Sequence, residues 1–177
     1  MIGQATHIEN SAPVRQFAAE SNTRQFVTFT LGAQQYCVDI MAVREIRAAN
    51  VITPLPSAPE FVRGVINLRG TIVPIIDLRT RFALGRTEIS QGIVVVVMIE
   101  GRLNGLLVDG VSDILTVRQA DIAAIPETDG EKRNPFFDGL ITQGEAMLIV
   151  IALESLARTS VQAAAPLPSP SELEPVA

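Results

Sequence analysis

The sequence has very few of the residues that most catalytic and metal sites use. Among its 177 residues there is one cysteine, Cys37, one histidine, His7, one lysine, Lys132, and no tryptophan. A histidine-based catalytic triad and a multi-histidine metal site both need more histidines than this chain has. With one cysteine no disulfide can form within the chain, which is typical of proteins from a reducing compartment.

Positive charge and long apolar runs are also scarce. The formal net charge is -5 and aromatic residues make up 5% of the chain, which argues against binding to duplex or single-stranded nucleic acid. Uninterrupted apolar runs such as Ile93 to Ile99 are far shorter than the roughly 18 residues of a membrane helix. The segment Met1 to Asn10 lacks the features of a signal peptide. We therefore expect a soluble, cytoplasmic protein.

The motifs of nucleotide binding are missing, and the few reactive side chains have structural explanations. Neither a phosphate-binding loop nor a glycine-rich dinucleotide motif occurs. Cys37 lies in an alternating apolar segment, as a buried structural thiol does, and His7 lies in a polar N-terminal arm. Asp109 and Asp113 could form an acid/base pair, but neighbouring glycines favour turn and cap roles. We expect no catalytic residue, no metal site and no cofactor.

What the sequence has in quantity is Val and Ile in short runs separated by Gly and Pro. Hydrophobic residues make up 47% of the chain, and residues branched at Cβ favour strands. Asp39 is predicted to cap a short helix with Ile40, Val43 and Ile46 on one face and Arg44, Glu45 and Arg47 outward. The predicted strands are Phe26–Leu31, Tyr36–Val38, Val51–Leu55, Val65–Leu68, Ile72–Ile76, Ile93–Glu100, Leu103–Val108 and Met147–Ala152.

The stretch from Gly64 to Arg79 is the most informative in the chain. It predicts two strands joined by a tight turn at Asn67-Leu68-Arg69-Gly70, followed by Asp77 as the cap of a short helical turn. Because Arg69 interrupts an apolar segment at a turn, we expect its guanidinium at the surface, in contact with a partner protein. For the nearby Arg79, Arg81 and Arg86 we expect an ordinary solvated surface.

The chain also contains a weak internal repeat. Val38-Asp39 and Val108-Asp109 follow similar hairpins at an offset of 70, and Gly64 to Leu78 resembles Gly139 to Leu153 at an offset of 75. The repeat predicts two small β units, joined near residues 85–92 and packed on one another. We expect residues 1–24 to form a disordered arm, residues 25–160 the folded domain, and residues 161–177, rich in Ala and Pro, a disordered tail.

From about Gln25 to Arg158 the sequence resembles the CheW-like family of bacterial chemotaxis coupling proteins. The segments that carry the resemblance are FTLGAQQYCVDIMAVREI, RGVINLRGTIVPIIDLRTRF and NGLLVDGVSDIL, in the order of that family. The resemblance implies an all-β fold of two SH3-like five-stranded β-barrels packed together. It implies an adaptor without catalytic activity that joins the cytoplasmic tips of chemoreceptors to the regulatory domain of the histidine kinase CheA. Such an adaptor is recruited to membrane-associated receptor arrays through its partners.

The resemblance also suggests site residues. Val43, Glu45 and Arg69 match positions implicated in receptor binding, and Gly64 and Gly70 match positions where a side chain would disturb the same surface. For Val43 a core role competes with the interface role, because it lies on the apolar face of the predicted helix. A second interpretation, a CheW-like coupler of a non-flagellar pathway such as surface motility, stays open at this point.

Overall fold

The computed structural model describes residues 22–127 and 133–163, and this part of the chain folds into two β-sheets. The six-stranded sheet contains β1 (Thr23–Leu31), β2 (Gln34–Asp39), β8 (Gly110–Arg118), β9 (Ile122–Ala123), β10 (Phe137–Gln143) and β11 (Ala146–Ile151). The five-stranded sheet contains β3 (Val43–Ala48), β4 (Val62–Leu68), β5 (Thr71–Asp77), β6 (Ile93–Ile99) and β7 (Arg102–Val108). The helices are η1 (Ile40–Ala42), α1 (Leu78–Arg81), η2 (Gln119–Asp121) and α2 (Leu153–Ala163).

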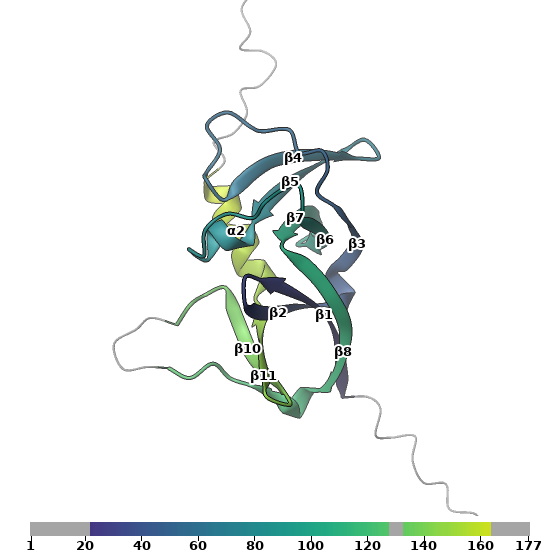
Figure 1. Cartoon of the computed structure of the whole chain (residues 1–177), viewed down its shortest axis with the longest axis vertical. Helices are drawn as coiled ribbons and strands as arrows, with labels where there is room; N and C mark the ends of the chain where they lie inside the picture. The colour runs from purple at the N-terminus through teal and green to yellow at the C-terminus, as the bar shows by residue number, and fades with distance from the viewer. Residues whose placement is uncertain (1–21, 128–132, 164–177) are drawn as a thin grey trace, which may run out of the picture.

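The two sheets form two subdomains, one above the other in Figure 1. The strand order is β8-β1-β2-β11-β10-β9 in the lower sheet and β3-β6-β7-β5-β4 in the upper sheet. Neighbouring strands are antiparallel except for β2 with β11 and β5 with β7. The predicted all-β fold with two packed subdomains is confirmed, although one subdomain has six strands and not five.

The repeat is present, but its two copies exchange hairpins. The β1–β2 hairpin from the first half of the chain joins β8 to β11, and the β6–β7 hairpin from the second half joins β3 to β5. The chain therefore crosses between sheets after Asp39 and again after Asp109, the two aspartates that the repeat aligns. The predicted junction at residues 85–92 is wrong, because this segment connects α1 to β6 within one subdomain.

The largest core lies between the two subdomains and is built by both. It contains Val27, Phe29 and Tyr36 from the lower sheet together with Val95 and Val97 from the upper sheet. Along β6, alternate residues enter this shared core and the separate core of the upper sheet, to which Val94 and Val96 belong. Both faces of β6 are buried, which is why this strand is an uninterrupted apolar run.

Three local predictions differ from the structure. The predicted helix after Asp39 is limited to the single turn η1, and the strand β3 follows it at once. The predicted strand Val51–Leu55 is reduced to one bridge, between Thr53 and Val65, because Pro54 lacks the amide hydrogen needed to extend the ladder. The strands β8, β9 and β10 were not predicted, and β8 is largely exposed, so its sequence lacks a long apolar run.

The terminal predictions fall mainly outside the described residues. Residues 1–21 and 164–177 are not described, so the expected disorder of the arm and the tail stays a prediction. Within the described part, β1 begins at Thr23, inside the predicted arm, and α2 reaches Ala163, three positions beyond the predicted domain end at 160. In the described ranges no helix is long and apolar enough to cross a membrane.

A buried carboxylate fixes the end of β5. Asp77 is fully buried and accepts hydrogen bonds from Arg63 Nη1 at 2.7 Å and from the backbone and hydroxyl of Thr87 at 3.0 and 2.9 Å. It also caps α1 through the backbone amides of Arg79 and Thr80, as predicted. Burial raises the pKa of Asp77, but these donors outweigh it and hold the pKa below its ordinary value.

Asp77→Asn is expected to reduce the free energy of unfolding by about 3 kcal/mol at pH 7, because it leaves the guanidinium of Arg63 buried without its counter-charge. Since the pKa of Asp77 is lower in the folded than in the unfolded protein, the ionised carboxylate stabilises the fold fully above about pH 4. That stabilisation is lost as the pH falls through the folded-state pKa. The free energies of unfolding of the wild type and Asp77→Asn, measured with urea, should therefore converge between pH 7 and pH 3. A difference that stays constant with pH would contradict this role of Asp77.

Candidate functional site

The turn between β4 and β5 displays Arg69. Leu68 pairs with Thr71, so Arg69 and Gly70 form a two-residue hairpin turn with φ angles of 51° and 87°. Positive φ at both positions is the type I′ geometry that suits the twist of a hairpin. The side-chain oxygen of Asn67 accepts a hydrogen bond from Gly70 N at 2.8 Å and closes the turn. The predicted turn is confirmed, and the side chain of Arg69 is 80% exposed.

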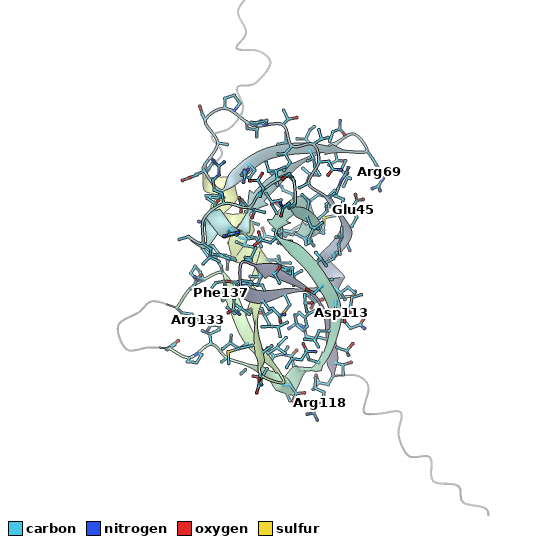
Figure 2. All side chains as sticks on the ribbon, in the orientation of Figure 1. Glu45, Arg69, Asp113, Arg118, Arg133 and Phe137 are labelled. Carbon is cyan, nitrogen blue, oxygen red and sulfur yellow. The ribbon has the colours of Figure 1, made fainter. Side chains whose placement is uncertain are left out.

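Arg69 forms an ion pair with Glu45 and so connects the β4–β5 turn to β3, the strand at the opposite edge of the upper sheet. Arg69 Nη2 lies 2.9 Å from Glu45 Oε2, and Arg47 Nη1 lies 3.6 Å from the other carboxylate oxygen. Figure 2 shows Glu45 and Arg69 close together, one on β3 and the other at the hairpin tip. An exposed pair of this kind stabilises a protein by at most about 1 kcal/mol. A carboxylate from a partner protein can therefore compete for Arg69.

A β-bulge in β3 determines which side of the strand each of its side chains faces. Val43 pairs with Val97 and Glu45 with Val96, so Arg44 is the extra residue of the bulge. Val43 and Ile46 therefore face one side of β3, while Glu45 and Arg47 face the other. The grouping of Val43 with Ile46 was predicted correctly, but from a helix period. The actual cause is a bulged strand.

On the side of Val43, β3 and β8 border an apolar groove of about 360 Å³. The repeat offset of 70 also relates Val43 to Asp113, so equivalent positions of the two copies meet in this groove. Figure 2 shows Asp113 on the same side of the molecule as Glu45 and Arg69, but on the other subdomain. The lining residues are Val27, Ile40, Val43, Ile46, Val111 and Ile114, with Ser112 and Asp113 as the polar members.

The two candidate glycines have different structural roles. Gly70 has a positive φ, but a Cβ there would contact nothing within 4 Å. Gly64 is buried at the other end of β4, with φ at 142°, and a Cβ there would collide with the backbone carbonyl of Thr53. Gly70 therefore shapes the turn that carries Arg69, whereas Gly64 keeps β4 in contact with the segment before it.

Two of the arginines predicted to lie on an ordinary solvated surface have specific contacts. Arg81 is inserted between two aromatic rings, 4.4 Å from the centre of Phe61 and 4.3 Å from that of Phe136, and burial lowers its pKa. Arg79 forms a partly buried ion pair with Asp109 at 3.3 Å. For both the prediction is wrong, because sequence alone does not show the rings and the carboxylate that distant strands bring to them. Arg86 is exposed.

The side chains considered for chemistry have structural roles within the described residues. Cys37 is completely buried, as predicted, and burial raises the pKa of its thiol to about 12. Asp109 accepts a hydrogen bond from Gly32 N at 2.6 Å, and Asp113 accepts one from Ile114 N at 2.7 Å. Among the described residues no group of three or more His, Cys, Asp and Glu side chains is arranged to hold a metal ion. His7 lies outside the described residues.

Comparison with known proteins agrees with this geometry. The model of one protein family, described as CheW-like domain, matches residues 25–161. The chain belongs to the CheW-like domain family. CheW relatives include the chemotaxis protein CheW of Klebsiella aerogenes, 41% identical over 82% of this chain and 88% of the relative. The chemotaxis protein CheW of Rhizobium meliloti is 40% identical over 75% of this chain and 86% of that protein.

A solved structure shares the CheW fold. The crystal structure of the scaffolding protein TtCheW from Thermoanaerobacter tengcongensis has a TM-score of 0.69 to this chain and 34% sequence identity. The match covers 75% of this chain and 91% of TtCheW. The similarity supports the CheW fold, with its two β-sheet subdomains, for this chain.

Gly64→Ala is expected to lower the free energy of unfolding by about 3 kcal/mol, because the new Cβ meets the Thr53 carbonyl and the backbone is strained. Gly70→Ala should cost only about 1 kcal/mol, since only the left-handed backbone opposes it. Gly101→Ala, at the open turn of β6–β7 with φ at 77°, is the matched control for Gly70→Ala. Urea unfolding measures all three, and equal losses at Gly64 and Gly70 would contradict the distinction.

Proposed function

We propose that this protein is a non-enzymatic adaptor that couples chemoreceptors to the histidine kinase CheA in bacterial chemotaxis. The observation that supports it most strongly is the CheW-like match across residues 25–161, the same residues that form both sheets. The relatives at about 40% identity are named chemotaxis proteins, and the structural relative is named a scaffolding protein. Such an adaptor acts in the cytoplasm and joins membrane-associated arrays by binding its partners.

The receptor-binding residues of this adaptor are Val43, Glu45 and Arg69. Val43 and Glu45 lie on β3, and Arg69 lies at the tip of the β4–β5 hairpin, where it pairs with Glu45. Arg69 offers an exposed guanidinium, and Val43 offers part of an apolar groove. A helical hairpin of a receptor tip supplies both apolar side chains and carboxylates, which suits this combination. Gly70 supports this surface directly, and Gly64 supports it through the packing of β4.

The kinase needs a second surface, because an adaptor must hold both partners at once. Another surface of the two subdomains pairs with the regulatory domain of CheA, which has a similar fold. Such coupling transmits a signal only if the adaptor binds the signalling states of receptor and kinase with different affinities. The direct test is to titrate the purified protein against the kinase regulatory domain and against a receptor signalling fragment. Failure to bind either one would refute the proposed function.

Arg69→Glu is expected to weaken receptor binding about tenfold or more, because it replaces the attractive charge with a carboxylate beside Glu45. The melting temperature should stay near that of the wild type, since the ion pair is exposed. Arg118→Glu, which breaks the exposed pair with Asp121 in the other subdomain, is the matched control and should bind normally. Isothermal titration measures the affinity, and a large loss of stability instead would reassign Arg69 to a structural role.

Val43→Thr tests whether the groove and the ion pair serve the same partner. We expect a three- to tenfold loss of receptor affinity, because a hydroxyl replaces a methyl group on the wall of the groove. Val43 borders the groove on one side of β3, and Arg69 contacts Glu45 on the other side. The loss of binding free energy in the double variant should therefore equal the sum of the losses in Val43→Thr and Arg69→Glu. An unchanged receptor affinity in Val43→Thr would leave Val43 as a core residue only.

A further inference from the structure

The β4–β5 hairpin has a second, outward face that no role described so far uses. Thr53 bridges Val65 in β4, and β4 pairs with β5 along its length, so three chain segments form one ribbon at the upper end of Figure 1. Its inward residues are buried in the core of the upper subdomain; they are Ile66, Leu68, Val73 and Ile75. Because side chains alternate along a strand, the residues between them lie on the opposite face, where Ile72 is exposed and Val65 and Pro74 are half-buried.

The outward face is apolar where a solvated sheet normally carries charge. Val65 lies opposite Pro74, and Asn67 lies opposite Ile72, so these four side chains share the face. Thr53 of the third segment joins them through its bridge to Val65, and the exposed Val51 precedes Thr53 by two residues. Of these six outward positions four are apolar and none is charged. Val51 is 76% exposed and Ile72 61% exposed. An exposed apolar face of this kind marks a surface that binds another protein.

Folding does not account for this face. Val51 and Ile72 keep most of their surface in water, so they add little to the core. Pairing with another strand at the edge of the ribbon is hindered, because Pro54 and Pro56 follow Val51 in the outer segment and lack amide hydrogens. What the face can accept is therefore a side-on partner with its own regular structure, such as a helix.

The face is continuous with Arg69. The turn that carries Arg69 is the end of the same hairpin, two residues beyond Asn67 and three before Ile72. The guanidinium contacts Glu45 through one nitrogen and is otherwise exposed, so its remaining donors are free for a carboxylate of a partner. The equivalent hairpin β10–β11 carries an exposed Met147 at the position of Ile72, but Gln143, Gly144 and Glu145 at its turn and no arginine.

We propose that the outward face of Val51, Val65, Ile72 and Pro74 extends the receptor surface beyond Arg69. Its occupant is an amphipathic helix of the chemoreceptor tip that places apolar side chains against Val51 and Ile72 and a carboxylate against Arg69. This inference rests on the proposed function, since it names further residues for the same partner. It adds a second apolar part to receptor recognition, made of residues that do not line the groove of Val43.

Val51→Gln, Ile72→Gln and the double variant test the inference, with Met147→Gln as the matched control. Met147 is 52% exposed and lies at the equivalent position of the other hairpin, so its substitution makes the same chemical change outside the proposed surface. We expect each variant on the face to bind a receptor signalling fragment about tenfold more weakly than the wild type. Affinity for the kinase regulatory domain and the melting temperature should stay unchanged in all four proteins.

The salt dependence of receptor binding distinguishes the charged part of the surface, at Arg69, from the apolar part, at Ile72. The loss caused by Arg69→Glu should shrink between 50 mM and 500 mM salt, because exposed charges are screened, whereas the loss caused by Ile72→Gln should persist. If the wild type binds the receptor fragment and both glutamine variants bind equally well, the inference fails and the proposed function stands. An equal loss in Met147→Gln would also overturn it. If the wild type does not bind the fragment, the proposed function itself fails.

Discussion

The rest of the structure depends on burying both faces of the central strands at once. Alternate residues of β6 enter the core shared between the subdomains and the core of the upper subdomain, and β7 does the same with Leu106 and Leu107. Each sheet also takes a hairpin from the other half of the chain. Neither half of the sequence can complete a subdomain alone, so the two subdomains form one cooperative unit. Their relative position is therefore set by packing and not by a flexible linker.

That constraint explains how short polar features can fix the position of the proposed receptor surface. The chain crosses between subdomains at Asp39 and Asp109, and each aspartate is held by an arginine, Arg24 at 2.7 Å and Arg79 at 3.3 Å. Directly after these crossings come β3 and β8, which border the groove. The buried Asp77 anchors β5 in the same way at the base of the hairpin that displays Arg69. Aspartates paired with arginines thus hold the chain at both crossings between the sheets and at the end of β5.

The sequence was sufficient to predict the elements whose period is unambiguous. The strands around Phe29, Val95 and Ile75 alternate or run apolar because they border one or two cores. The boundary of the repeat was not predictable, because an exchange of hairpins leaves the same order of elements along the chain. Strand β8 was missed because most of its residues are exposed and only Val111, Leu115 and Val117 pack against the cores, which leaves no apolar run to detect.

The candidate site was predictable in part for a similar reason. A charged residue at the turn of an apolar hairpin is visible in sequence, so Arg69 could be identified from the residues. Its partner Glu45 lies 24 positions away on another strand, and a single extra residue in β3 decides which way that carboxylate faces. Bulges and long-range ion pairs depend on register, which local sequence patterns do not specify. Only the family resemblance selected Glu45 in advance.

The rigidity of the core also bears on how an adaptor of this kind can transmit a signal. Val43 and Arg69 are fixed on opposite sides of β3, whose inner neighbour β6 is buried on both faces, so their separation cannot change without disrupting two cores. What can change at low cost is the exposed pair between Arg69 and Glu45, because each side chain keeps access to water when the pair opens. A partner that binds Arg69 therefore alters local contacts and not the shape of the scaffold. Coupling through such a protein follows from holding two partners at a fixed separation, with the change of state residing in the partners.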